Sequence, residues 1–258
     1  MSGESEKLAE GTLISHLLEL RDRLIRCLIA VAIAFAPCAY FQNQLYTFVA
    51  QPILDQLPKG ATLIATNIVA PFMAPFKLSF VLGLFIAIPY VLWQIWAFVA
   101  PGLYKHEKKF AVPLIVSSIA LFYIGVAFAY KFVFPVIFHY FISNAPEGVT
   151  ATPDITAYLD FVLTMSVAFG VAFEVPIAVI LLVITGIISL EKLKNARGYV
   201  LIGIFVIAAI LTPPDAVSQC IMAIPMYLLY EGGMIMARIL GKIRSEGKAR
   251  EEKEAGVS

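Results

Sequence analysis

The stretch LSFVLGLFIAIPYVLWQIWAFVA, from Leu78 to Ala100, runs for 23 residues without a charged side chain. A helix needs about 20 mostly apolar residues to cross the ~30 Å hydrocarbon core of a bilayer. The whole chain has the same character, because 60% of its 258 residues are hydrophobic and 14% are charged. A soluble domain is about 45–50% apolar. The sequence therefore predicts an all-α integral membrane protein.

Six apolar stretches are expected to span the membrane. Their ranges are Leu24–Phe41, Phe76–Val99, Phe110–Phe134, Leu159–Ile188, Tyr199–Thr212 and Ala216–Ala237. The fifth would be only about 21 Å long at ~1.5 Å per residue. The sixth contains Pro225 and soon reaches Glu231. We therefore expect short fifth and sixth helices, beside which the bilayer is thinned.

The basic residues predict the orientation of the spans. Sixteen of the 19 Lys and Arg residues lie in the N-terminal segment, the second-to-third and fourth-to-fifth loops, and the C-terminal tail. Because Lys and Arg favour the cytoplasmic side, both termini are predicted to be cytoplasmic. Residues 1–240 are expected to form a single six-helix domain, of which residues 1–23 are a cytoplasmic amphipathic lead-in. Residues 241–258 are expected to be a charged, disordered tail.

Composition excludes several classes of function. A net charge of +1 gives no basic field for nucleic acid. The three cysteines and three histidines show no metal-ligand spacing. Nucleophile elbows, zinc motifs and phosphate loops do not occur in the sequence. We therefore expect no metal, no cofactor and no enzymatic activity, and the energy for any transport must come from the membrane gradient or a partner.

The first candidate site lies on the amphipathic stretch Thr12–Leu28. Its polar side chains predict two favourable i,i+4 ion pairs, Glu19 with Arg23 and Asp22 with Arg26. Arg21 lies on the apolar side of the helix, where a guanidinium must reach phosphates or a carboxylate. This stripe is either a solvated interfacial face or a surface that presents the Glu19 carboxylate to a ligand.

A second carboxylate follows the second span, in WAFVAPGLYKHEKK (Trp96–Lys109). Pro101 and Gly102 predict a turn. Glu107 is the only acid among the lysines of this loop. It either pairs with those lysines or lies exposed near Glu19, in which case each carboxylate could accept the forked guanidinium of an arginine-containing ligand.

A third candidate is FGVAFEVPIAV (Phe169–Val179), which places Glu174 near the middle of the fourth span. A charge at that depth costs about 2.5–3.5 kcal/mol on insertion scales. Pro176 removes the helical donor to the Ala172 carbonyl and predicts a bend. Glu174 could stabilise packing, or it could bind an ion, a proton or a polar group of a partner.

Four segments together resemble the TatC family, a subunit of the twin-arginine protein translocase. These are HLLELRDRL (His16–Leu24), FVAPGLYKHEKK (Phe98–Lys109), FGVAFEVP (Phe169–Pro176) and LTPPD (Leu211–Asp215). Independently of the resemblance, Asp215 after two prolines predicts an N-cap for the sixth helix.

The resemblance implies a cupped six-helix receptor of the inner membrane. It would bind the paired-arginine signal peptides of folded cargo, assemble with the single-span subunits TatA and TatB in an oligomer, and use the proton-motive force. By position, the signal-peptide residues would be Glu19, Glu107, Arg21, Phe98, Pro101 and Leu103. Partner docking or transport within the membrane would use Glu174, Pro176 and Tyr130, and the outer-face structural positions would be Pro52 and Asp215.

Two other functions compete with this one. A proton- or ion-coupled secondary transporter centred on Glu174 would explain the intramembrane acid, but it would usually show paired broken helices and more polar residues at the midplane. It would also leave the cytoplasmic carboxylates without a role. An intramembrane enzyme is disfavoured because the sequence lacks nucleophile and metal motifs.

Overall fold

The computed structural model describes residues 2–55, 57, 62–103, 111–144, 152–212 and 215–255, with side chains from Ser15 to Lys242 outside residues 99–111. This part of the chain is almost entirely helical, and an isolated bridge joins Ile64 to Asp154. The helices form two compact units. One comprises Met1–Gln51 and Ala65–Ile119, and the other comprises Pro52–Ile64 and Ala120–Ser258.

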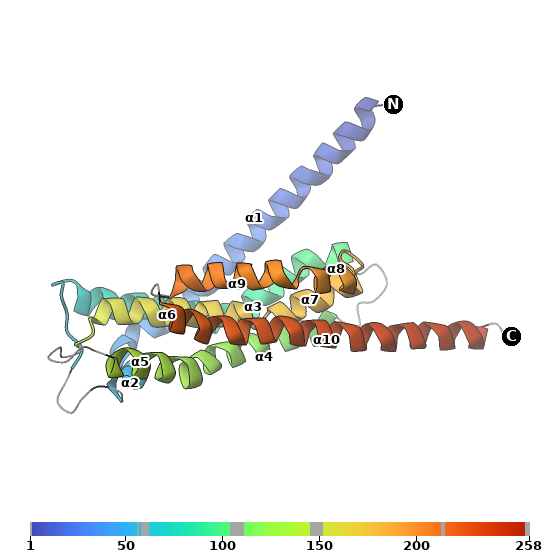
Figure 1. Cartoon of the computed structure of the whole chain (residues 1–258). Coiled ribbons are helices and arrows are strands. Elements are labelled where there is room, and N and C mark those ends of the chain that lie inside the picture. The colour runs from blue at the N-terminus through green and yellow to red at the C-terminus, as the bar shows by residue number, and fades with distance from the viewer. Residues whose placement is uncertain are drawn as a thin grey trace. The chain divides into compact units, whose positions relative to one another are not determined.

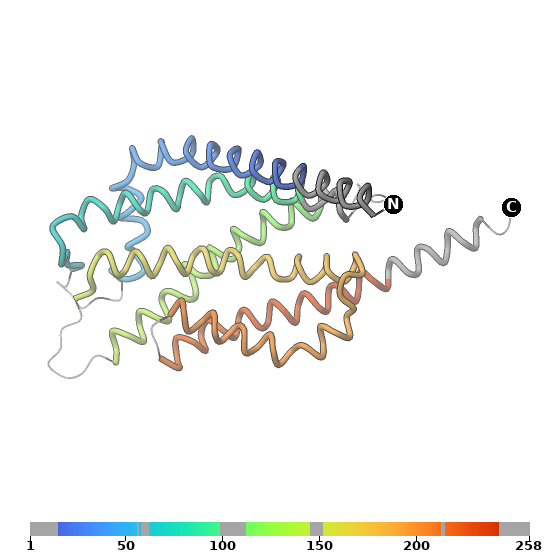
Figure 2. The backbone as a smooth tube through the Cα atoms, turned by 90° about the horizontal axis from the view of Figure 1, so that it is seen from above, coloured from blue at the N-terminus to red at the C-terminus, as the bar shows by residue number. Residues whose placement is uncertain are grey.

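The first unit is built on α1 (Ser2–Tyr40) and α3 (Ala70–Leu103), which lie side by side (Figure 2). In chain order, α2 (Gln42–Leu54) comes between these two helices and follows α1 directly. Small residues allow the close approach of α1 and α3, since a Cβ on Gly83 would lie 2.9 Å from the Phe35 backbone. Within the apolar contact, the buried Ser79 hydroxyl donates to the Cys38 carbonyl at 3.1 Å.

The third predicted span is longer than the sequence indicates. α4 (Ala111–Phe128) continues through a π-helical segment, η2 (Ala129–Val133), into α5 (Phe134–Ser143). The prediction ended this span at Phe134, close to Pro135. The proline lies in the first turn of α5, where its missing N–H costs little, and the π-helical turn adjusts the backbone just before it.

The fourth predicted span is broken as Pro176 indicates. α6 (Ile155–Ala172) is followed by its C-cap Phe173, and α7 (Val175–Ile184) begins after Glu174, with the proline in its first turn. The bend is therefore confirmed. α8 (Leu190–Asn195) then leads into α9 (Arg197–Leu211), whose 15 residues confirm a short fifth helix.

The prediction of a short sixth helix is wrong. α10 runs for 40 residues, from Ala216 to Ala255, and passes through Pro225 without ending (Figure 1). The predicted N-cap is confirmed, because the Ser218 N–H donates to Asp215 Oδ1 at 2.8 Å. The sequence predicts disorder after Gly241, whereas α10 continues as a helix to Ala255. The Glu, Lys, Arg and Ala residues there favour helix.

The described helices make this a multi-pass α-helical membrane protein. Those long and apolar enough to cross a bilayer are Ser15–Tyr40, Ala70–Phe98, Val112–Ser143, Ile155–Ile184 and Ala216–Lys242. The shorter apolar helix Arg197–Leu211 would be the remaining span, fifth in chain order. Six crossings, the cupped arrangement and the single domain ending at residue 240 stay predictions.

A polar network surrounds Glu231, an acidic residue within the apolar part of α10. Arg197 Nη2 lies 2.6 Å from Glu231 Oε2, and the Tyr227 hydroxyl donates to Glu231 Oε1 at 2.9 Å. From the residue next to Glu231, the buried Tyr230 hydroxyl donates to the Leu193 carbonyl at 2.8 Å. The carboxylate is thereby paired with a cation within the protein, at a partly exposed position. The same contacts tie the start of α9 and the end of α8 to α10.

α7 packs against α10 at unusually close range. A Cβ on Gly233 would lie 2.8 Å from Pro176 Cα and 3.2 Å from Val179 Cβ. The neighbouring Gly232 faces open space, with no atom within 4 Å of such a Cβ. Glycine at position 233 therefore lets the proline-bent start of α7 lie directly on α10.

This contact predicts opposite effects for two adjacent substitutions. Gly233→Ala should lower the Tm in lipid nanodiscs, because overpacking costs about 1–3 kcal/mol. A loss of 1 kcal/mol lowers the Tm by about 2–4 °C in a chain of this size. Gly232→Ala is the control and should leave the Tm unchanged or raise it, since alanine favours helix. Equal effects of the two substitutions would contradict the close approach.

The Arg197–Glu231 pair predicts a measurable coupling. In a cycle of Arg197→Met, Glu231→Gln and the double variant, the Tm changes should be non-additive by the equivalent of ~1 kcal/mol. The matched control is the Arg21–Asp22 pair, whose side chains are 63% and 51% exposed and whose coupling should be close to zero. Additive effects at Arg197 and Glu231 would mean that the pair does not hold α9 to α10.

Candidate functional site

The N-terminal part of α1 meets the last turns of α3 through matching stripes of side chains. His16, Glu19 and Arg23 share one face of α1 at helical spacing. Opposite them, α3 contributes Gln94 and the Ala97 carbonyl to Arg23, and it stacks Phe98 on the His16 ring at a centroid distance of 4.3 Å. We refer to these six residues as the α1–α3 polar cluster.

Arg23 is the centre of the α1–α3 polar cluster. Its Nε and Nη2 donate to Glu19 Oε1 at 3.0 and 2.6 Å. Its Nη1 donates to Gln94 Oε1 at 3.0 Å, and Nη2 also donates to the Ala97 carbonyl at 3.2 Å. Gln94 is only 4% exposed, and the Arg23 side chain is 21% exposed. The guanidinium is therefore fixed on α3 and in turn fixes Glu19.

The structure confirms one of the two predicted ion pairs on α1 and corrects the other. Glu19 and Arg23 pair at i,i+4. Asp22 bonds the adjacent Arg21 at 2.8 Å instead of Arg26. Arg21 has thus found a carboxylate, but it does so at the exposed surface. The polar stripe is divided, because Glu19 and Arg23 face α3 while Arg21 and Asp22 face outward.

The remaining predicted signal-peptide residues lie beside this cluster or outside the described residues. Phe98 is part of the cluster, and Pro101 and Leu103 belong to the last turn of α3. The predicted turn at Pro101 is therefore wrong for the backbone up to Leu103, which is helical. Glu107 lies outside the described residues, so its predicted proximity to Glu19 stays a prediction.

Glu174 lies at the break between α6 and α7. It occupies the N-cap position of α7, and its carbonyl accepts from the Ala178 N–H at 3.0 Å. The side chain is half-buried, and its Oε1 atom is shielded from solvent. Pro176 follows two residues later and contacts α10 at Gly233. The break therefore places a carboxylate where one helix ends, another begins and a third is in contact.

The other predicted positions are spread over the second unit. Tyr130 lies in the π-helical segment η2, half-buried and 6.5 Å from the Phe134 ring centroid. Pro52 is buried within α2, and Asp215 caps α10. The structure gives each of them a structural setting, and their predicted functional roles stay predictions.

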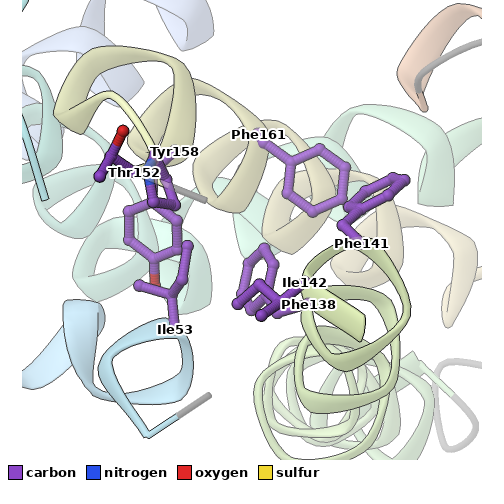
Figure 3. Close-up of a pocket in the computed structure, with 8 residues that line it drawn as sticks. Ile53, Phe138, Phe141, Ile142, Thr152, Tyr158 and Phe161 are labelled. Atoms are coloured by element: carbon purple, nitrogen blue, oxygen red, sulfur yellow. The ribbon is translucent and has the colours of Figure 1, made fainter. Parts of the chain in front are cut away.

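A groove of about 360 Å³ lies near the isolated bridge of the second unit. Figure 3 shows aromatic rings converging on it from α5 and α6. Its lining residues are Ile53, Phe138, Phe141, Ile142, Thr152, Pro153, Tyr158 and Phe161. This lining is almost wholly apolar and offers no charged group to a ligand.

Gln94 and the Arg197–Glu231 pair were not predicted as functional or structural residues. Gln94 could have been noticed, because a single amide within an uncharged apolar run must find a partner. The pairing of Glu231 with Arg197 leaves no local signal, since the two residues are 34 positions apart. In the side chains that the structure describes, no group of three or more His, Cys, Asp or Glu could hold a metal ion.

Most of the chain matches known proteins. Residues 15–225 match the family model for the Sec-independent protein translocase protein TatC. The TatC of Haemophilus influenzae is 54% identical over 226 residues, 88% of each chain. The TatC of Escherichia coli K12 is 51% identical over 241 residues, 93% of this chain and 92% of that one.

Solved structures agree with the sequence relatives. A crystal structure described as the twin arginine translocase receptor TatC is similar with a TM-score of 0.79 and 39% identity, covering 87% of this chain and 98% of that one. A second, in the detergent DDM, gives a TM-score of 0.80 and 38% identity, covering 86% and 99%. The chain therefore belongs to the TatC family of Sec-independent protein translocase proteins.

Proposed function

We propose that this protein is the receptor subunit of a twin-arginine translocase and binds the paired arginines of signal peptides with Glu19 and Glu107. The observation that carries the proposal is the fixed Glu19 carboxylate. It is 42% exposed, and both hydrogen bonds from Arg23 end on Oε1. A carboxylate held in this way can accept a further guanidinium on Oε2.

The surroundings of Glu19 suit a peptide that carries arginines next to apolar residues. Phe98 offers an aromatic ring one turn of α1 away, where it stacks on His16, and Pro101 and Leu103 follow in the last turn of α3. Glu107 would supply the second carboxylate, and Arg21 would orient the peptide or the headgroups around it. The peptide would approach from the cytoplasm, since the distribution of basic residues puts both termini there.

The intramembrane part of the proposal concerns assembly. Glu174, with Pro176 and Tyr130, would receive a polar group from a single-span partner of the TatA or TatB type. A carboxylate at a helix break offers acceptors that an unbroken apolar helix does not. The resulting hetero-oligomer would lie in the inner membrane and move folded cargo by using the proton-motive force.

Two alternatives are not supported. The TatC family is a protein translocase family, which leaves the ion-coupled secondary transporter centred on Glu174 without support. The family is not enzymatic. Glu174 is therefore assigned to assembly or transport of protein cargo rather than to small-ion flux.

Peptide binding tests the receptor proposal. A fluorescent signal peptide with Arg-Arg should bind the protein in nanodiscs more tightly than its Lys-Lys counterpart, because lysine lacks the forked guanidinium. Glu19→Gln with Glu107→Gln should raise the Kd for the Arg-Arg peptide at least ~10-fold, since hydrogen bonds to charged groups contribute about 1.5–3 kcal/mol.

Glu191→Gln is the matched control for that experiment. Glu191 is an exposed carboxylate in the first turn of α8, and its substitution should leave the Kd unchanged. Equal affinity for the two peptides, or an unchanged Kd in the double variant, would rule out the receptor site as described.

Crosslinking tests the role of Glu174. A photo-crosslinker at Val171, which is 58% exposed, should capture TatB, and Glu174→Ala should lower the yield several-fold. Glu174→Gln should retain most of it because the amide still accepts hydrogen bonds.

Thr185→Val is the control, since the Thr185 hydroxyl donates to the Leu181 carbonyl of its own helix at 2.7 Å. Unchanged crosslinking in Glu174→Ala, together with loss of a small-ion flux, would refute docking at this position.

A further inference from the structure

We propose that Arg23 is a positioning residue that makes the Glu19 site selective for guanidinium over ammonium groups. The proposal rests on the proposed function, since it concerns how the same carboxylate recognises its ligand. It adds two residues to the site, Arg23 and Gln94, which act through Glu19 rather than on the peptide.

The first step is that displacing Arg23 from its hydrogen bonds would cost free energy. Its guanidinium donates four hydrogen bonds, to Glu19, Gln94 and the Ala97 carbonyl. If it left, the amide of Gln94 would lose its partner in a position that is only 4% exposed. An unsatisfied buried polar group costs about 1–3 kcal/mol. Arg23 is therefore a fixed part of the site and not a placeholder for the arginine of the peptide.

The second step concerns which oxygen of Glu19 is used. Arg23 Nε and Nη2 both end on Oε1, so among the described residues Oε1 carries the internal guanidinium and Oε2 is left to the ligand. The carboxylate plane is set by these two bonds. A guanidinium, whose N–H donors lie in one plane, benefits from an acceptor of fixed direction more than an ammonium, which is a rotatable point charge.

The third step concerns the anchor on α3. Gln94, Ala97 and Phe98 recur at helical spacing, and each holds one part of the α1 stripe. The Phe98 ring stacks on His16 at an interplanar angle of 21°, one turn before Glu19. Glu19 is thus held by α3 through Arg23, while the His16 contact fixes the preceding turn of α1.

The two possible roles of Arg23 make opposite predictions. If Arg23 were only a nearby positive charge, Arg23→Met would remove a repulsion and tighten binding of both cationic peptides. If Arg23 positions Glu19, Arg23→Met should raise the Kd for the Arg-Arg peptide about 10-fold and leave the Kd for the Lys-Lys peptide nearly unchanged. Arg23→Lys should behave like Arg23→Met, because lysine cannot bridge Glu19, Gln94 and Ala97 together.

The experiment measures the ratio of the two peptide affinities for the full chain in nanodiscs, by fluorescence anisotropy. The matched pair is Gln94→Glu, which keeps an oxygen acceptor for Arg23, and Gln94→Met, which removes it at similar length. Gln94→Glu should keep the ratio of the native protein, and Gln94→Met should lower it several-fold. This pair carries the test if Arg23→Met does not fold.

A merely structural role would lower the fraction of active protein and leave the ratio unchanged. An unchanged ratio in Arg23→Met and Gln94→Met, or tighter binding of both peptides, would overturn the positioning role. If the native protein itself binds the two peptides equally, the proposed function fails together with this inference. If the native protein prefers the Arg-Arg peptide and both variants keep that preference, the positioning role of Arg23 is wrong but the proposed function stands.

Discussion

Polar groups placed in hydrocarbon must be hydrogen-bonded within the protein, because lipid offers no donors or acceptors in place of water. This constraint decides which contacts join the helices of each unit. The Ser79 hydroxyl donates to the Cys38 carbonyl, and Gln94 accepts a hydrogen bond from Arg23. Glu231 accepts hydrogen bonds from Arg197 and Tyr227. Apolar packing brings the helices together, but these contacts fix which residues face each other.

The same constraint explains how the chain combines stability with function. Glu231 is matched by a guanidinium and a hydroxyl and lies within the regular helix α10. Glu174 instead lies at a break that Pro176 creates, where the backbone is no longer a continuous helix. An acid at such a break is a feature that packing alone does not require. That difference favours an assembly role for Glu174 and a structural role for Glu231.

Features that depend on local sequence could be predicted, and those that depend on distant partners could not. The break at Pro176, the Asp215 cap and the short α9 follow from neighbouring residues and chain length. The partner of Glu231 within α10 could not be predicted, because it is Arg197, 34 positions away. The role of Arg23 also depends on Gln94, 71 positions away. The pairing of Glu19 with Arg23 was predicted from its spacing, but the face of α1 on which it lies was not.

The central claim is that Glu19, held by Arg23 on α3, receives an arginine of the signal peptide. Its most direct test is a cryo-electron microscopy structure of the protein in nanodiscs with a bound Arg-Arg peptide. The account predicts a guanidinium of the peptide within hydrogen-bonding distance of Glu19 Oε2, with Arg23 still bonded to Gln94. Peptide density away from Glu19, or an Arg23 side chain released from Gln94 to make room for the peptide, would contradict it.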